Sequence, residues 1–304
     1  MLTEKIFGKE FKRQGKGDKI FDVINYTVLF GVLLLVLYPL FFIVIASFSD
    51  PGAVARGEVL FLPKGFNLDG YVKIFQNKDI WSGYTNSIIY TVVGTTINIL
   101  LTIPAAYALS RKELVGRKYL MGLITFTMFF GGGLIPTYLL VNNLGLNNTM
   151  WALILPTAVG TYNLIVSRTY FVNSIPEELF EAGKVDGCSY FRFFVSIVIP
   201  ISMPIVAVMI LMYAVGHWNA YFNSLIYIRD RAKYPLQVIL RELLIQQESA
   251  AGMGGDAASM AEQQKLADML KYGIIIVSSL PVLCMYPFVQ KYFVKGVMIG
   301  AVKG

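Results

Sequence analysis

The chain has 304 residues, of which 56% are apolar and only 15% are charged. This composition is far more apolar than that of a soluble globular domain, so the sequence predicts a membrane protein. Its two cysteines, Cys188 and Cys284, lack the spacing of a disulfide framework or a metal site, and a single histidine excludes any site that needs two imidazoles.

Six apolar runs follow one another along the chain. An α-helix needs about 20 residues to cross the roughly 30 Å of hydrocarbon in a bilayer. We therefore expect an all-α membrane protein with six transmembrane helices, at residues 21–48, 84–109, 119–141, 150–172, 197–227 and 272–290. The first run is too long for the apolar part of a secretory signal peptide, so we interpret it as a retained span.

Basic residues in the short connections predict the orientation. Residues 1–20 hold six Lys and Arg and residues 111–118 hold four, whereas residues 142–149 hold none. The N-terminus is therefore expected in the cytoplasm, and with six spans the C-terminus lies there too. The cytoplasmic segments then carry 16 basic and 9 acidic residues and the outer segments 10 of each, so the whole net charge of +7 faces the cytoplasm. Topology and attraction to anionic membrane lipid explain this basicity, and no nucleic-acid motif is present.

This topology divides the chain into three parts. We expect a basic cytoplasmic segment at 1–20, a transmembrane domain at 21–292 and a cytoplasmic tail at 293–304. The transmembrane domain contains two long connections, a charged cytoplasmic insert at 174–196 and an outer loop at 228–271.

The charged insert carries the signals of a short helix. Ser174 and Glu177 have capping-box spacing, and Pro176 falls in the first turn, where a missing N–H costs nothing. The helix is expected to end at Gly187, which suits the left-handed conformation of a helix terminus. Ser189 can then cap the helix that runs into the fifth span.

One face of this helix is expected to be short-sided. Leu179, Ala182, Gly183 and Asp186 lie at spacings of three, four and seven residues, which places them on one side of a helix. Such a face lets another surface approach closely, so the pattern favours a helix that a partner grips.

The insert resembles a motif of the integral-membrane subunits of ATP-binding-cassette importers, in which E-A-A is followed after three residues by G and after nine more by I-x-L-P. The residues that match it are Glu181, Ala182, Gly187, Ile197 and Pro200. The chain departs from the motif at Gly183, where the motif has Ala, and at Ile199, where it has Leu. Glycine weakens a helix by about 1 kcal/mol relative to alanine.

Further stretches resemble the carbohydrate-uptake permeases of this class, similar to the second permease subunit of maltose-type importers. They are "NSIIYTVVGTTINILLTIPAAYALSR", "GGGLIPTYLLVNNLGLNNTMWALILP", "AVGHWNAYFNSLIYI" and "KYFVKGVMIGAVKG". The resemblance implies the type I permease fold, with a cytoplasmic coupling helix between the fourth and fifth spans that sits in a cleft on an ATPase subunit. A plain surface helix between two spans is the alternative.

The resemblance also implies a set of partners in a bacterial cell membrane. A second permease forms a heterodimer with this chain, two ATPase subunits bind ATP and Mg, and an extracellular solute-binding protein delivers a carbohydrate, which we expect to be an oligosaccharide. No cofactor is expected on this chain, and it is not expected to be an enzyme.

The source of energy separates this hypothesis from two rivals. The sequence has no G-x-x-x-x-G-K-[ST] phosphate loop, so any ATPase must be a partner. An ion-coupled secondary sugar carrier would need ionisable residues near the middle of the membrane. Here Asp22 and Arg168 lie near span ends and His217 stands alone in the fifth span. A structural membrane subunit without a transport path is the second rival.

The third span contains the stretch "FFGGGLIPTY", where Gly131, Gly132, Gly133 and Pro136 are expected to break or kink the helix. A broken helix of this kind can line a path through the membrane. Close packing of helices through small residues is an equal alternative.

The end of the fifth span, "GHWNAYFNS", combines amides with aromatic rings. Amides pair with sugar hydroxyls, and rings stack on apolar sugar faces. We therefore predict a substrate path lined by His217, Trp218, Asn219, Tyr221 and Asn223. An aromatic belt at the outer surface with amide bonds between helices is the alternative.

Overall fold

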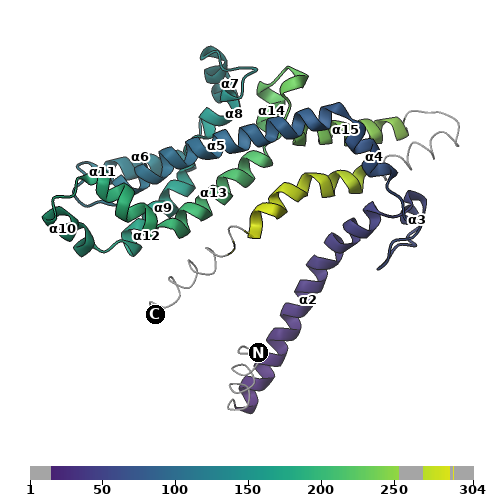
Figure 1. Ribbon diagram of the computed structural model, residues 1–304, viewed down its shortest axis with the longest axis horizontal. Helices are drawn as coiled ribbons and strands as arrows, with labels where there is room; N and C mark the ends of the chain where they lie inside the picture. Colours follow the sequence, from purple (N-terminus) through teal and green to yellow (C-terminus); the bar gives the residue numbers. More distant parts are fainter. Residues whose placement is uncertain (1–14, 253–269, 288–289, 291–304) are drawn as a thin grey trace. The chain divides into compact units, whose positions relative to one another are not determined.

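The computed structural model of the protein describes residues 15–252, 270–287 and 290, and every regular element in this part is a helix (Figure 1). The expected helical fold is thus confirmed for these residues. The first 14 residues of the predicted N-terminal segment and the predicted tail at 293–304 lie outside them. The chain divides into two compact units, which are described separately.

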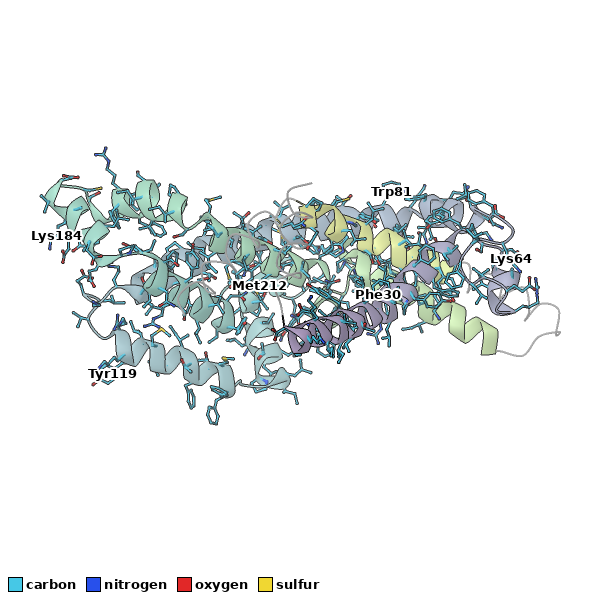
Figure 2. The ribbon with its side chains drawn as sticks, turned by 90° about the horizontal axis from the view of Figure 1, so that it is seen from below. Phe30, Lys64, Trp81, Tyr119, Lys184 and Met212 are labelled. Carbon is cyan, nitrogen blue, oxygen red and sulfur yellow. The ribbon has the colours of Figure 1, made fainter. Side chains whose placement is uncertain are left out.

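The first unit contains the chain up to Lys73 together with Ala250–Ile276. Its main element is α2, Lys16–Ser47, which covers the first expected span. Most side chains of this helix are exposed, Leu35 to 75%, and Figure 2 shows them standing out around Phe30. Apolar side chains that protein does not cover are typical of a helix surrounded by lipid.

A short outer segment follows α2 in the same unit. Asp50 caps α3, Pro51–Ala55, by accepting a hydrogen bond of 3.1 Å from the N–H of Ala53. Ile45, Ala53 and Val59 form a small core beneath it. The next helix is α4, Asp69–Gln76.

The second unit is built around the long helix α5, Lys78–Ser110, which corresponds to the second expected span. It packs against α9, Thr161–Ser174, and α13, Met203–Trp218. Figure 1 shows these three helices side by side. Their shared core includes Ala106, Phe171 and Met209, none of which is more than 1% exposed.

The third expected span is broken, as the glycine run predicts. It consists of α6, Arg117–Phe129, and α7, Leu134–Asn143, which meet at an angle of 112°. Gly133 has a φ of +82°, a conformation that side chains with a Cβ rarely adopt. Glycine at this position therefore permits the reversal of direction between the two helices.

The expectation of one unbroken helix over 150–172 is wrong. This region contains α8, Trp151–Ile154, a 3₁₀ turn η1 at Leu155–Thr157, and α9 after a break at Gly160. Pro156 has no N–H to donate to the preceding turn, which favours an interruption here. The freed backbone groups find partners on α5 and α13, namely the side chains of Asn98 and Tyr213.

The fifth expected span is also divided. The chain from Tyr190 to Ile201 is bent by 80° against α13, with a π-helical turn and Pro200 before the bend. A π turn and a proline both disturb the regular ladder of helical hydrogen bonds, which accounts for a bend. The elements before α13 are α10, Glu177–Val185, α11, Tyr190–Phe193, η2, Phe194–Val198, and α12, Ile199–Ile201. Those after it are α14, Phe222–Tyr227, η3, Arg231–Lys233, α15, Leu236–Gly252, and a last helix, Leu270–Pro287.

Among the described residues, three helices are long and apolar enough to cross a membrane, namely α2, α5 and Leu270–Pro287. The number becomes five if each of the two bent pairs forms one span. The fourth expected span, interrupted after α8, is not among them. The protein is thus a multi-pass membrane protein, and the count of six stays a prediction.

Candidate functional site

Helix α10 from the charged insert is anchored by one aromatic side chain. Phe180 is buried, and its ring meets that of Phe193 edge-on with centroids 5.4 Å apart. The guanidinium carbon of Arg111, at the end of α5, lies 3.9 Å from the centre of the Phe180 ring. Cation–π contacts of this kind are worth about 0.5–2 kcal/mol, depending on exposure. Phe180 therefore connects α10 both to α5 and to the chain that leads into α13.

An ion pair holds the beginning of α10. Glu177 lies 2.5 Å from the ammonium of Lys112 and 3.8 Å from the guanidinium of Arg111. The hydrogen bond to Glu177 and its negative charge raise the pKa of Lys112 above its usual value. The predicted capping box with Ser174 is not formed, because Pro176 occupies the N-cap position and no side chain caps the helix. Glu177 bonds to Lys112 instead.

The end of α10 follows the sequence prediction. Gly187 has a φ of +71°, and the N–H of Cys188 donates to the carbonyl of Gly183 over 2.9 Å. Ser189 then caps α11 by accepting a hydrogen bond of 3.3 Å from the N–H of Arg192. The two helices are therefore joined by a tight turn that requires the left-handed glycine.

The four residues predicted to form one short-sided face of α10 do not all lie on its exposed side. Gly183 is buried, and a Cβ added there would lie 2.8 Å from the ring of Phe193. Glu181, Ala182 and Asp186 are exposed, and Val185 is exposed to 88%. Small size at Gly183 thus serves packing within this chain, because Phe193 needs the space that a methyl group would fill. Figure 2 shows α10, marked by Lys184, at the same end of the unit as Tyr119.

The last two motif residues lie where the chain bends into α13. Ile197 belongs to the π-helical turn and packs against the core that contains Phe193 and Val198. Pro200 is exposed in α12, directly before the bend of 80°. The motif therefore extends from the exposed helix α10 to the hinge at the base of α13.

A buried polar network crosses the middle of the second unit. The side-chain amide of Asn98, on α5, donates to the carbonyls of Thr157 and Ala158 over 2.8 Å each. Its oxygen lies 2.6 Å from Nε2 of His217, on α13. Because the Asn98 nitrogen uses both its hydrogens as donors, its oxygen must accept, so His217 Nε2 carries the proton. Asn98 is fully buried and thus supplies partners to the interrupted fourth span.

Tyr213 completes this network on the side of α9. Its hydroxyl lies 2.8 Å from the hydroxyl of Thr102 and accepts a hydrogen bond of 3.0 Å from the N–H of Gly160. Non-helical backbone at membrane depth is tolerated only where such partners are available. The break between η1 and α9 is therefore a stable feature of the fold.

Two of the predicted path residues form hydrogen bonds with other parts of the chain. His217 bonds to Asn98, and Trp218, 4% exposed, donates its indole N–H to the carbonyl of Ser278 over 2.9 Å. Both polar groups therefore have partners within the chain, and the role of these residues in a substrate path stays a prediction. Local sequence patterns could not reveal this, because both partners are distant in the chain.

The other three predicted path residues lie beyond the end of α13. Asn219 is exposed, and Tyr221 and Asn223 are partly exposed. The guanidinium carbon of Arg241, on α15, lies 4.6 Å from the centre of the Tyr221 ring. A ring face, amides and a cation thus gather at this end of the unit, and their role in a substrate path stays a prediction.

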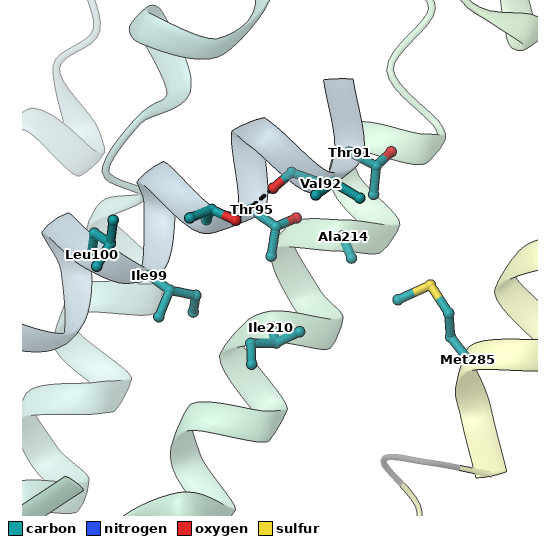
Figure 3. A pocket seen from close by; sticks show the side chains of 9 residues that line it. Thr91, Val92, Thr95, Ile99, Leu100, Ile210, Ala214 and Met285 are labelled. Carbon is teal, nitrogen blue, oxygen red and sulfur yellow. Dashed lines mark hydrogen bonds between the residues drawn. The ribbon is translucent and has the colours of Figure 1, made fainter. Parts of the chain in front are cut away.

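A cavity of about 410 Å³ lies between α5, α13 and the last helix (Figure 3). Its wall is mainly apolar and includes Ile210, Ala214 and Met285. The hydroxyls of Thr91 and Thr95 are buried at this wall without a hydrogen-bond partner in the described part of the chain. None of the residues that the sequence suggested for a substrate path lines this cavity. The sequence feature that could have indicated it is the pair of threonines, Thr91 and Thr95, four residues apart in an apolar helix.

Comparison with known proteins identifies the family. Residues 80–229 match the model of the binding-protein-dependent transport system inner membrane component. The polygalacturonan/rhamnogalacturonan transport system permease protein YtcP of Bacillus subtilis is 41% identical over 288 residues, 94% of this chain and 99% of the relative. The arabinooligosaccharides transport system permease protein AraQ of Halalkalibacterium halodurans is 27% identical, over 90% of this chain and 93% of the relative.

A solved structure agrees with this result. One chain in the crystal structure of a bacterial ABC transporter involved in the import of the acidic polysaccharide alginate superposes with a TM-score of 0.80 and 31% identity, covering 92% of this chain and 99% of that one. The chain therefore belongs to the binding-protein-dependent transport system inner membrane component family. It is a permease subunit of a carbohydrate importer of the ATP-binding-cassette class.

Proposed function

We propose that the exposed face of α10 is the surface through which this permease is driven by a partner ATPase. The observation that carries the proposal is that α10 has one anchored side and one uncovered side. Phe180 and Gly183 are buried against the chain, whereas Glu181, Ala182 and Val185 are exposed. The uncovered side of α10 is therefore accessible to a protein partner, while the anchored side fixes its position on the chain.

The contacts of α10 would allow it to transmit motion from the ATPase to the membrane helices. Arg111 connects it to the end of α5, and Phe193 connects it to the chain that bends into α13. A displacement of α10 by a closing ATPase dimer would thus be passed to two packed helices at once. ATP and Mg bind to the two ATPase subunits, and this chain performs no bond chemistry.

We further propose six spans with both termini in the cytoplasm, a second permease as heterodimer partner and a solute-binding protein outside the cell. The charge asymmetry of the connections supports the orientation. The family's dependence on binding proteins, given in its description, supports the external partner.

The cargo that we propose is an oligosaccharide that carries carboxylates. YtcP is named for polygalacturonan and rhamnogalacturonan, and the alginate transporter is described as importing an acidic polysaccharide. In this chain, Arg241 lies over the ring of Tyr221, which stands between Asn219 and Asn223 in the sequence. A sugar ring and a carboxylate would find partners in this segment. Uptake that survived ATP depletion but not loss of the ion gradient would instead favour a secondary carrier. Uptake that survived deletion of this chain would favour a structural subunit.

The coupling proposal is tested on the complete complex in vesicles. Glu181→Lys reverses an exposed charge on α10, and Gly187→Val places a β-branched residue at a φ of +71°. Both are expected to leave the protein inserted but to detach the ATPase or to abolish sugar-stimulated ATP hydrolysis. Arg192→Glu, a charge reversal on α11, is the control and should keep both activities. Normal stimulated hydrolysis in both α10 variants would refute the assignment.

A further inference from the structure

A second cavity, of about 400 Å³, opens where α5 ends, between the α5–α6 connection, α9 and the start of α10. Its wall is strongly basic. It contains four cations, Arg111, Lys112, Arg117 and Arg168, and a single carboxylate, that of Glu177. A concave surface with this charge balance attracts an anion.

Bonds within the chain neutralise only part of this charge. Lys112 pairs with Glu177, and Arg111 pairs with Glu113 over 3.1 Å, whereas the other two cations bond only to uncharged groups. Arg168 donates to the carbonyl of Leu109 over 3.0 Å, and Arg117 lies 3.4 Å from the carbonyls of Ser110 and Arg111. These acceptors are uncharged groups at the end of α5. The two guanidinium charges are thus held at the cavity wall by neutral partners and stay available to an anion.

Arg111 supplies a more specific observation. Its side chain is only 15% exposed, and its Nε is buried without a hydrogen-bond partner in the part of the chain that the structure describes. Leaving a buried charged donor unpaired is costly, since its hydration is lost without replacement. Because Arg111 lines the cavity, an anionic oxygen bound there would add an acceptor close to this guanidinium.

Another part of the wall is apolar, although Ser110 and Asn173 also line the cavity. Tyr107, Phe171 and Ile175 form its inner side, and Val172 is exposed at its rim on α9. The α5–α6 connection contains Val115, which is 92% exposed. A small inorganic ion would leave this apolar part unused, whereas an amphiphile would cover it.

We propose that this cavity binds the phosphate of an anionic phospholipid headgroup, with the start of its acyl chains along Val172. Basic pockets between spans at the cytoplasmic face are suited to such headgroups. The phosphate would lie between the α5–α6 connection and the start of α10, next to the pair of Lys112 and Glu177. The lipid would thereby stabilise the position of α10. The site does not depend on the cargo, and the proposed orientation decides only in which leaflet the lipid resides.

The test compares phosphatidylglycerol with phosphatidylcholine on the complete complex. The purified complex is exchanged into mild detergent with each lipid, and bound lipid is measured by native mass spectrometry. The double variant Arg117→Gln, Arg168→Gln removes two charges from the cavity wall. Lys112→Gln removes one more cavity charge at an exposed side chain, so this substitution leaves the core intact. Lys118→Gln is the matched control, because it removes the neighbouring charge, which does not line the cavity.

A cation close to an anionic headgroup contributes about 1 kcal/mol, so affinity for phosphatidylglycerol is expected to fall about fivefold for each cavity charge removed. The control and the affinity for phosphatidylcholine should stay unchanged. Equal retention of phosphatidylglycerol by the wild type, Lys112→Gln and Lys118→Gln would overturn the proposal. Displacement of the lipid by inorganic phosphate alone at equal concentration would also overturn it and identify a free phosphate as the ligand. If the cavity variants lose the lipid but keep ATPase coupling, the lipid site is supported and is shown to be independent of the coupling role proposed for α10.

Discussion

Nε2 of His217 lies 2.6 Å from the side-chain oxygen of Asn98, and this bond joins α13 to α5 at the interruption of the fourth expected span. The side-chain amide of Asn98 also donates hydrogen bonds to the carbonyls of Thr157 and Ala158. A residue that the sequence suggested for sugar binding thus supports the backbone of a neighbouring segment. The polar groups in this part of the membrane domain have a structural function.

Replacing Asn98 by Leu keeps its approximate size and removes all three hydrogen bonds. Each buried group left without a partner is expected to cost about 1–3 kcal/mol. The detergent-solubilised complex should therefore unfold at a clearly lower temperature, which scanning fluorimetry measures. Thr96→Val is the control, since Thr96 bonds only to the carbonyl of Val92 within its own helix. An unchanged midpoint for Asn98→Leu would mean that the carbonyls of the break find other partners.

Gly94 provides a second test of the same contact. A Cβ at this position would lie 2.5 Å from Nε2 of His217, closer than atoms can approach. Gly94→Ala is expected to push the imidazole away from Asn98 and to cost about 1–3 kcal/mol of stability, as overpacking does. Gly122→Ala is the control, because a Cβ there meets nothing within 4 Å and the helix gains from alanine. Equal behaviour of the two variants would contradict the close packing.

The features that the sequence predicted correctly are determined by neighbouring residues. The break after Phe129 follows from three adjacent glycines, and the turn at Gly187 follows from one glycine followed by the cap Ser189. Such signals act over a few residues and need no tertiary contact. A local pattern of residue types is therefore sufficient to predict them.

The features that the sequence did not reveal depend on distant partners. The cap expected at Ser174 is absent, since Pro176 takes the N-cap position, and the Glu177 carboxylate pairs instead with Lys112, 65 positions earlier. The indole N–H of Trp218 donates to the carbonyl of Ser278, 60 residues later in the chain, and no local pattern reveals this bond. The apolar runs predicted the long helices α2 and α5, but they could not show which polar side chains would face one another inside the second unit.

The pair of Lys112 and Glu177 predicts how the start of α10 responds to charge and pH. Lys112→Glu should loosen this turn, and the exchange Lys112→Glu with Glu177→Lys should restore it, as hydrogen exchange of the α10 amides would show. Because Glu177 raises the pKa of Lys112, the contribution of the pair is complete below the ordinary lysine value of 10.5 and is lost as the pH rises through the raised value. The pair is exposed, so the effect should shrink at high salt. Faster exchange in the charge-exchanged variant than in Lys112→Glu would contradict the pairing.

Restoring the motif alanine at Gly183 is expected to harm this protein. The added Cβ would lie 2.8 Å from the ring of Phe193, which is fully buried and cannot easily move. The gain of about 1 kcal/mol in helix propensity should be outweighed by about 1–3 kcal/mol of overpacking. Gly183→Ala should therefore lower the unfolding temperature of the complex and weaken ATPase retention on size-exclusion chromatography. Adding Phe193→Leu makes room for the methyl group, so in the Phe193→Leu background the same alanine should be harmless or stabilising. If alanine is equally harmful in both backgrounds, Phe193 is not the reason why glycine stands here.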